Sequence, residues 1–215
     1  ELVEKYHDWA DTPEEADFAI VMIQEPYPGT GYDVSDRSRG GNGYVPISLH
    51  YRPYQAEHAR SKSIAGGDPK EFFTNRSYNG KTVKTLNESD LDLVIETRKA
   101  MGEKPVVVVV NVTRPVVLAE LEPYADAVLL TFGVQNQAVM DIVSGAAEPS
   151  ALLPMQMPAD MRTVEEQCED LPHDMRPLRD SDGNLWDFGF GLDWKGPIHD
   201  ARTARYCPAS SDGRD

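Results

Sequence analysis

Three short apolar runs most constrain how this chain folds. In these runs, polar residues do not alternate with the apolar ones. They are residues 17–23 (DFAIVMI), 105–110 (PVVVVV) and 127–130 (AVLL). A strand with one face in water alternates apolar and polar side chains, whereas a strand buried on both faces does not. The runs therefore predict strands of a parallel sheet with helices covering each side.

The segments between these runs have helical patterns. Residues 87–101 carry apolar side chains on one helical stripe, and Gly102 follows as a stop signal. Residues 116–124 and 135–144 have the pattern of two further helices, and Thr163–Glu166 forms a capping-box motif. Strands that alternate with helices form βαβ units. The predicted fold class is α/β, with a mostly parallel sheet sandwiched by helices.

Residues 28–86 interrupt this alternation of strands and helices. They predict a long, aromatic-rich insertion. Only residues 53–63 within it have the pattern of a helix. Connections of this length are uncommon in compact domains and are usually functional or disordered. The many aromatic rings favour order, because they need the domain, a neighbouring subunit or a ligand to pack on. We expect residues 1–200 to form one domain that includes this insertion, and the polar residues 201–215 to form a tail.

Composition excludes some classes of function. The 215 residues include 36 acidic and 21 basic side chains, a formal net charge of −15, which argues against binding to a nucleic-acid backbone. The longest apolar run is far shorter than the ~20 residues that cross a bilayer, so no membrane is expected as a partner. Cys168 and Cys207 lack neighbours at zinc-ligand spacing, and two ordinary thiols are favoured over a disulfide between them.

Polar residues follow each predicted strand where it ends. Gln24 to Tyr27 follow the first strand, Asn111 to Arg114 the second, and Phe132 to Gln137 the third. In an open α/β sheet, ligands bind outside the carboxyl ends of the strands. Each group alone is better explained by helix capping and loop hydrogen bonds, but the three groups together predict a binding site at this edge.

Four segments together resemble the carboxyl-terminal sandwich domain of glycoside hydrolase family 3. They are residues 16–27 (ADFAIVMIQEPY), 104–132 (KPVVVVVNVTRPVVLAELEPYADAVLLTF), 141–158 (DIVSGAAEPSALLPMQMP) and 187–194 (DFGFGLDW). The family includes β-glucosidases, exo-β-glucanases, xylosidases and N-acetylglucosaminidases. The resemblance covers residues 16–194, with residues 28–86 as an unusually long insertion.

The resemblance implies the second domain of a retaining β-glycosidase of the β-glucosidase type, which hydrolyses terminal non-reducing sugars without a metal or an organic cofactor. The family's nucleophile is an aspartate on a preceding (β/α)8 barrel, and such a barrel alone takes about 250 residues. The chain is therefore expected to be truncated at its amino-terminal side and inactive alone, with that barrel as its partner. By the same analogy, the enzyme is expected to be periplasmic or secreted.

The resemblance also places Gln135 where many members carry the glutamate that acts as general acid. An amide is no acid, so the acid lies elsewhere or the domain does not hydrolyse. Retaining hydrolysis needs two carboxyl groups about 5–5.5 Å apart, and the acid needs a raised pKa. Glu71, between aromatic residues of the insertion, and Glu25, at a strand end, are the candidate acids. Glu71 is preferred, although a surface carboxylate beside Lys70 explains it equally well; Asp33 and Asp36 are further alternatives.

Sugar binding at the rim of a cleft is expected from stacked rings and polar groups, for which the candidates are Tyr32, Asp33, Arg114, Gln135 and Asn136. Arg114 is also explained by an ion pair with an acid such as Glu120. The insertion is predicted to reach a second subunit and form a homodimer. The alternative function is a non-catalytic carbohydrate-binding or scaffold domain. A flavodoxin-like nucleotide binder ranks third, because the chain lacks a phosphate loop.

Overall fold

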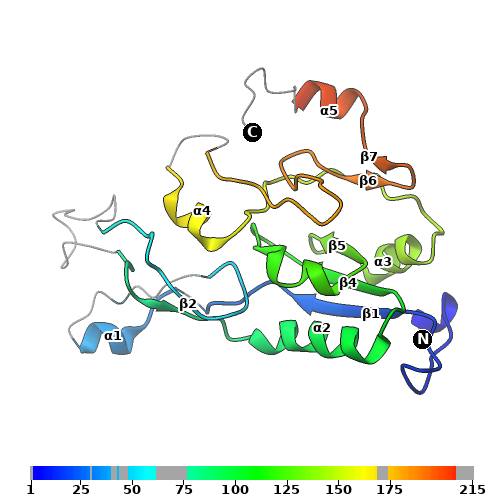
Figure 1. Ribbon diagram of the computed structural model, residues 1–215, viewed down its shortest axis with the longest axis horizontal. Coiled ribbons are helices and arrows are strands. Elements are labelled where there is room, and N and C mark those ends of the chain that lie inside the picture. Colours follow the sequence, from blue (N-terminus) through cyan, green and yellow to red (C-terminus); the bar gives the residue numbers. More distant parts are fainter. Residues whose placement is uncertain are drawn as a thin grey trace.

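The computed structural model describes residues 2–29, 31–39, 43, 48–61, 77–168 and 174–206. A three-stranded parallel sheet lies at its centre, in the order β1 (Ala19–Gln24), β4 (Val106–Asn111) and β5 (Ala127–Thr131) (Figure 1). In this register Val108 of β4 lies opposite Val21 of β1 and Val128 of β5. The predicted α/β fold with a parallel sheet is confirmed.

The central strand β4 is buried on both of its faces. Val106, Val108 and Val110 belong to the larger core cluster, to which α2 (Glu88–Met101) contributes Leu91 and Val94. The opposite face of the sheet carries Val109, which packs with side chains of α3 (Asn136–Val143). Figure 1 shows α2 and α3 on opposite sides of the sheet. Two apolar environments explain why the valine run does not alternate with polar residues.

The amino-terminal segment completes the second face. The short 3-10 helix η1 (Val3–Lys5) brings Leu2, Val3 and Tyr6 against the α3 side of the sheet. The Tyr6 hydroxyl donates a hydrogen bond of 2.7 Å to Asp141 Oδ1 of α3, which ties the two ends of this layer together.

Shorter elements surround this centre. The insertion contains α1 (Val34–Ser38) and an antiparallel pair, β2 (Tyr54–Gln55) with β3 (Thr82–Val83). Two 3-10 helices, η2 (Leu118–Glu120) and η3 (Glu122–Tyr124), connect β4 to β5. The carboxyl-terminal part forms α4 (Met161–Glu166), the antiparallel pair β6 (Leu192–Asp193) and β7 (Gly196–Pro197), and α5 (Ala201–Tyr206).

Three local predictions were wrong. Residues 53–63 begin with β2 and turns instead of a helix, because β3 supplies a strand partner. Residues 116–124 form two 3-10 turns, and Pro123 lacks the N–H that a continuous α-helix would use there. Thr163 lies inside α4: Asp160 is the N-cap and accepts the Thr163 N–H at 2.8 Å. Of the predicted tail, residues 201–206 form α5, and Cys207 lies outside the described residues.

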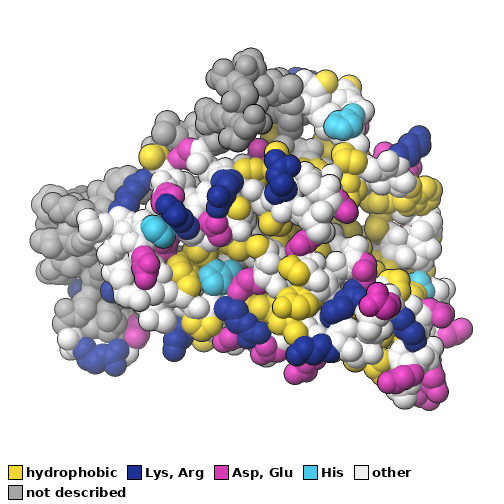
Figure 2. Space-filling model, in the orientation of Figure 1, with side chains coloured by type: hydrophobic (Ala, Val, Ile, Leu, Met, Phe, Trp, Pro, Cys, Tyr) yellow, Lys and Arg dark blue, Asp and Glu magenta, His cyan; other side chains and the backbone are white. Residues whose placement is uncertain are grey.

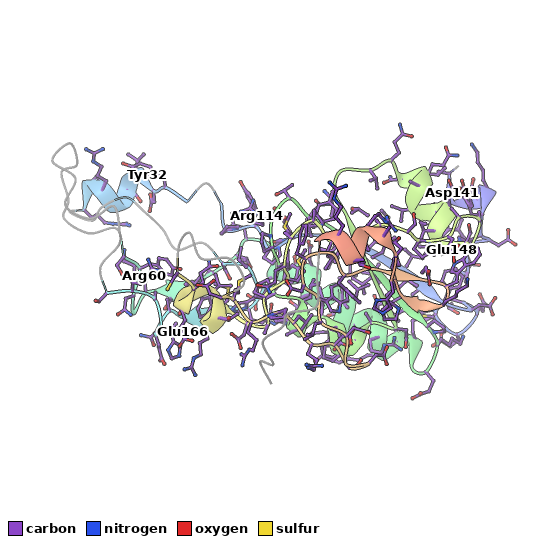
Figure 3. All side chains as sticks on the ribbon, turned by 90° about the horizontal axis from the view of Figure 1, so that it is seen from above. Tyr32, Arg60, Arg114, Asp141, Glu148 and Glu166 are labelled. Carbon is purple, nitrogen blue, oxygen red and sulfur yellow. The ribbon has the colours of Figure 1, made fainter. Side chains whose placement is uncertain are left out.

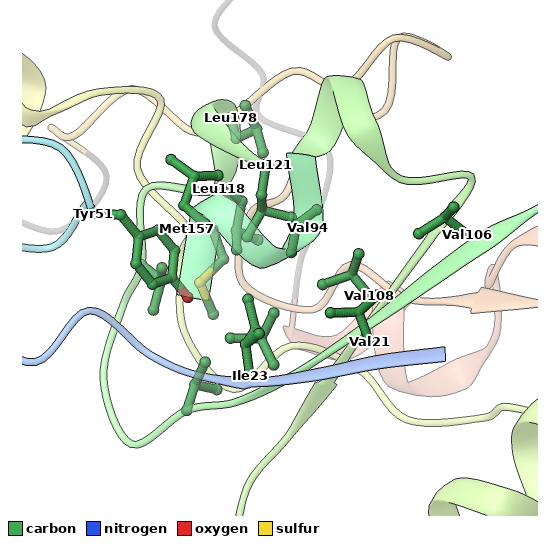
Figure 4. Packing of buried hydrophobic residues seen from close by; sticks show 14 of the residues in the cluster. Val21, Ile23, Tyr51, Val94, Val106, Val108, Leu118, Leu121, Met157 and Leu178 are labelled. Carbon is green, nitrogen blue, oxygen red and sulfur yellow. The ribbon is translucent and has the colours of Figure 1, made fainter. Parts of the chain in front are cut away.

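The described part of the insertion is anchored to the domain by one buried ring. Tyr51 is fully buried beside Leu118 and Met157 in the larger core (Figure 4). Its hydroxyl donates a hydrogen bond of 2.6 Å to the carbonyl oxygen of Gln24, the last residue of β1. Burial raises the pKa of Tyr51 far above its usual range, so the hydroxyl keeps the proton that it donates.

Two glutamates add polar anchors for the residues that adjoin Tyr51 in the insertion. Glu120 of η2 accepts the backbone N–H groups of Tyr51 at 2.5 Å and Arg52 at 3.0 Å, and His50 Nδ1 lies 3.0 Å from its Oε1. Glu165 of α4 is buried and accepts the Tyr54 hydroxyl at 2.9 Å and the His58 N–H at 3.1 Å. These bonds hold this part of the insertion beyond the carboxyl ends of the strands, as Figure 1 shows.

The surface carries charges of both signs. Figure 2 shows lysines and arginines interspersed with acidic side chains over one face of the molecule. Arg52 is one of the cations that pair across elements: its Nη1 lies 2.7 Å from Glu88 and its Nη2 lies 2.5 Å from Asp92, both on α2. This pair of contacts ties the insertion to the helix that covers the sheet.

The anchoring role of Tyr51 gives a graded prediction. Tyr51→Phe removes only the bond to Gln24 and should lower the free energy of unfolding by about 1 kcal/mol. Tyr51→Ala also leaves a cavity and should cost about 3–5 kcal/mol. Urea unfolding followed by circular dichroism measures both changes. Tyr27→Phe, at a half-exposed ring, is the control; equal stabilities of all variants would contradict the anchoring role.

Candidate functional site

The carboxyl ends of the three parallel strands meet around one side chain. Asn111 ends β4, and its Nδ2 donates a hydrogen bond of 3.1 Å to Gln24 Oε1 at the end of β1. Its Oδ1 accepts the Thr131 hydroxyl of β5 at 3.3 Å and the Gly133 N–H at 3.2 Å. The three groups of polar residues that were expected to share one sheet edge thus do so through a network of amides.

A hollow of about 220 Å³ opens beside this network. Its apolar floor includes Met22, Val109 and Val139, and its polar rim includes Asn111 and Asn136. The full set of lining residues is Met22, Ile23, Gln24, Val109, Asn111, Thr131, Gly133, Val134, Asn136 and Val139. None of these described lining residues is charged. An apolar floor with amide groups at the rim suits an uncharged ligand that carries hydroxyl groups.

The loop after β5 presents two free amides at this edge. Gly133 adopts a φ of +75°, which turns the chain from β5 toward α3 and favours glycine. Gln135 is the N-cap residue of α3, but its side chain makes no capping hydrogen bond. Gln135 and Asn136 are both exposed, and neither amide side chain bonds to any described residue. Their donors and acceptors are available to a ligand.

Glu25 lies one residue beyond β1, where its buried carboxylate pairs with the partly exposed Arg114. Its carboxylate accepts the Thr113 N–H at 2.5 Å, the Thr113 hydroxyl at 2.7 Å and the Arg114 Nε–H at 2.9 Å. Burial opposes ionisation of this carboxyl, but the Thr113 hydrogen bonds and the Arg114 charge outweigh burial, and the pKa of Glu25 is lowered. A general acid needs the opposite shift, so the geometry argues against Glu25 as the proton donor.

The sequence predicted two roles for Arg114, sugar binding or an ion pair with an acid such as Glu120. In the structure Arg114 does pair with an acid, but this acid is Glu25 and not Glu120. The Arg114 side chain is 37% exposed while Glu25 is 11% exposed. Only its Nε donates in this pair, and the terminal amino groups of the guanidinium form no hydrogen bond with a described residue. Arg114 lies near the middle of the molecule in Figure 3, between the insertion and the sheet.

Tyr32 and Asp33 lie apart from the amide edge. Asp33 Oδ1 accepts the N–H of Ser35 at 2.8 Å and its hydroxyl at 2.6 Å, which caps the start of α1. The Tyr32 hydroxyl accepts a hydrogen bond of 3.3 Å from Arg37. Figure 3 shows Tyr32 at one end of the molecule, well separated from Arg114, and Figure 1 shows α1 and α3 far apart.

The structure therefore brings Gln135 and Asn136 together at one edge, with Arg114 at a neighbouring strand end, and leaves Tyr32 and Asp33 outside this group. Glu71 lies outside the described residues, as does the side chain of Asp36. The sequence interpretation did not assign roles to Gln24 and Asn111, which organise the edge. Their positions as the first residues after two predicted strands were the signal that could have singled them out.

Comparison with known proteins places this chain in a family. Residues 4–194 match the model of the glycosyl hydrolase family 3 C-terminal domain. The chain belongs to this family, as the resemblance of its strand and loop segments implied.

Several curated relatives are fungal and bacterial glycosidases. The probable beta-glucosidase C of Aspergillus flavus is 27% identical over 187 residues, which is 87% of this chain and 22% of the relative. The probable beta-glucosidase C of Aspergillus oryzae is 34% identical over 47% of this chain and 16% of its own length. The periplasmic beta-glucosidase/beta-xylosidase of Dickeya chrysanthemi is 29% identical over 56% of this chain and 17% of its own length. The chain thus spans about a fifth of the length of these relatives.

The ion pair of Glu25 and Arg114 gives a prediction about pH. A carboxyl whose pKa is lower in the folded state stabilises the fold fully above its unfolded pKa of about 4.3. This contribution is lost as the pH falls through the folded pKa. Glu25→Gln should therefore cost about 2 kcal/mol of unfolding free energy at pH 7. The difference between wild type and variant should shrink below pH 4.

Urea unfolding at several pH values between about 2.5 and about 7, which lie on both sides of the unfolded pKa of about 4.3, measures this difference. Glu103→Gln, which alters an exposed carboxylate, is the matched control and should follow the wild-type curve. A Glu25→Gln variant as stable as the control at pH 7 would show that the pair does not stabilise the fold.

Proposed function

We propose that this chain is the second domain of a retaining β-glycosidase of the β-glucosidase type, which hydrolyses terminal non-reducing β-linked sugars. In this proposal the nucleophilic aspartate lies on a separate (β/α)8 barrel domain of the same protein, and this chain forms one wall of the sugar pocket. Membership of the family and the names of the relatives support the reaction class.

The uncharged, amide-rimmed hollow at the sheet edge is the observation that carries the proposal. A neutral sugar presents hydroxyl groups that both donate and accept hydrogen bonds, and an amide side chain does both as well. The C–H faces of a pyranose ring suit the apolar floor that Met22 and Val139 provide. Gln135 and Asn136 would bind the sugar hydroxyls, and the terminal amino groups of Arg114 would extend this surface. Tyr32 and Asp33 would contribute only if the ligand extends toward α1.

The proton donor has to be found outside the amide edge. Retaining hydrolysis uses one carboxylate that attacks the anomeric carbon and one carboxylic acid that protonates the leaving oxygen. Gln135 supplies no proton, and the lowered pKa of Glu25 keeps its carboxyl ionised. We therefore retain Glu71 as the proposed general acid, with Glu25 as the weaker candidate. Both carboxyls belong to segments that follow β1 along the chain.

A non-catalytic role is the alternative, in which the domain binds a carbohydrate or serves as a scaffold. It is favoured by the absence of any carboxylate among the described residues that line the hollow. Sugar binding without hydrolysis by the full-length protein would distinguish this role from the first.

The proposed partners and location follow from the same reaction. They are an oligosaccharide or glucoside substrate, the barrel domain, and a second subunit reached through residues 28–86, with a periplasmic or secreted location. One relative carries the word periplasmic in its name. Among the residues that the structure describes, none of the helices has the length and apolar character needed to span a membrane.

The first functional prediction concerns the two free amides. The full-length protein should hydrolyse p-nitrophenyl β-D-glucoside, and Gln135→Ala and Asn136→Ala should each lower kcat/KM about fivefold to tenfold, because each removes one or two hydrogen bonds to the sugar. Gln167→Ala is the control, since this exposed amide at the end of α4 forms no side-chain hydrogen bond with a described residue.

Three outcomes separate the functions. Hydrolysis that falls in both variants but not in the control supports the proposal. Binding of glucose without hydrolysis supports the non-catalytic alternative. A full-length protein that neither hydrolyses nor binds β-glycosides contradicts both.

The second functional prediction concerns assembly. If the insertion forms a dimer interface, Val34→Glu should convert a dimer into monomers, because Val34 is 72% exposed on α1 and a charge there opposes burial. Light scattering after size-exclusion chromatography measures the mass of the full-length protein. Leu93→Glu, on the exposed side of α2, is the control. A monomeric wild-type enzyme with full activity would contradict the dimer.

A further inference from the structure

We propose that Asn111 is a positioning residue that holds the loop of residues 132–136 in the conformation that presents Gln135 and Asn136 to a sugar. This inference rests on the proposed function, because it assigns a role in sugar recognition to a residue that need not touch the sugar. It is carried by the hydrogen bonds that join the three strand ends.

The backbone of Asn111 is fixed by the sheet on both sides. Asn111 lies opposite Gln24 of β1 and Thr131 of β5 in the parallel register. Its carbonyl oxygen accepts the Glu25 N–H at 3.0 Å, so the chain leaving β1 is bound to it as well. The side chain of Asn111 therefore projects from a backbone that is paired with a neighbouring strand on each side.

The loop of residues 132–136, by contrast, is joined to the strand ends by a single hydrogen bond among the described residues. The Gly133 N–H donates to Asn111 Oδ1 at 3.2 Å. Among the described residues, no other hydrogen bond joins residues 132–136 to another part of the chain. The next backbone bond, from the Ala138 N–H to the Gln135 carbonyl oxygen at 2.9 Å, is local to the start of α3. Loss of Asn111 therefore releases the segment that carries both free amides.

The network requires a side chain that accepts two hydrogen bonds and donates one. Asn111 Oδ1 accepts from Thr131 and Gly133, and Asn111 Nδ2 donates to Gln24 Oε1. Aspartate in this place keeps both acceptors, and the Gln24 amide, whose Nε2 has no partner among the described residues, can turn to donate to it. Leucine has a similar volume but neither donates nor accepts. The two substitutions thus separate the shape of the side chain from its hydrogen bonds.

The experiment uses the full-length protein with the variants Asn111→Leu, Asn111→Asp and, as control, Asn184→Ala. Asn184 is part-buried and bonds to Asp180 through its side chain at 3.0 Å, in a turn away from the sheet edge. We expect Asn111→Leu to lower kcat/KM for p-nitrophenyl β-D-glucoside about 30-fold, mainly through KM, because the amides that bind the sugar are displaced. Asn111→Asp should lose about threefold, and the control should keep the wild-type value.

Hydrogen–deuterium exchange of the peptide that covers residues 131–137 gives a second readout, independent of activity. Exchange at the Gly133 N–H should rise in Asn111→Leu and stay near the wild-type rate in Asn111→Asp, because the acceptor is lost only in the former. Unfolding temperatures of Asn111→Leu and Asn184→Ala identify any general loss of stability.

The outcomes are distinguishable. Activity that falls in Asn111→Leu and is retained in Asn111→Asp, together with faster exchange in the loop, supports the positioning role. Wild-type activity in Asn111→Leu, or an equal loss in Asn111→Leu and Asn184→Ala, overturns it while the proposed function stands. A wild-type protein without activity on any β-glycoside overturns the proposed function itself.

Discussion

The burial of β4 on both faces is the constraint on which the rest of this structure depends. Val106, Val108 and Val110 need the α2 side of the sheet, and Val109 needs the α3 side. Each buried valine contributes roughly 1.5–3 kcal/mol relative to exposure, so neither helix layer can be removed without loss of the fold. The same strand ends in Asn111, where the chain emerges at the sheet edge and its side chain bonds to both neighbouring strands. Apolar packing along β4 thus fixes where the polar edge begins.

The insertion is joined to this frame mainly by hydrogen bonds around one apolar anchor. The ring of Tyr51 is buried in the core, and its hydroxyl bonds to the end of β1. Glu120 and Glu165 then accept backbone and hydroxyl donors from the adjoining residues of the insertion. Because one anchor reaches the carbonyl of Gln24, the fold of the insertion and the geometry of the amide edge are physically linked.

At the edge of the sheet, the charged side chains lie apart from the uncharged hollow. The ionised pair of Glu25 and Arg114 lies at the strand ends beside Thr113, while the hollow next to it is lined by amides and apolar groups. The Thr113 hydrogen bonds and the pairing with Arg114 stabilise the Glu25 charge within the domain. The neutral hollow leaves hydrogen-bonding groups for an uncharged ligand, in a family whose relatives include β-glucosidases. Asn136 lines this hollow, and the amide of the preceding residue, Gln135, is uncharged and has no acidic proton to transfer.

The sequence by itself determined the α/β class, the three central strands, helices α2 and α3, and membership of the family, because each of these is carried by segments whose residues are close along the chain. Unalternating valines report burial on two faces, and a helical stripe reports one apolar partner. Tertiary structure decided the rest. Residues 53–61 form a strand and bends, because Tyr54 and Gln55 pair with β3, and Asp33 caps α1 instead of joining Gln135. The pKa of Glu25 is set by Thr113, 88 positions away, which no local pattern could identify. Hydrogen bonds and charges act over a few ångströms in space, so their partners are known only once distant segments of the chain have been brought together.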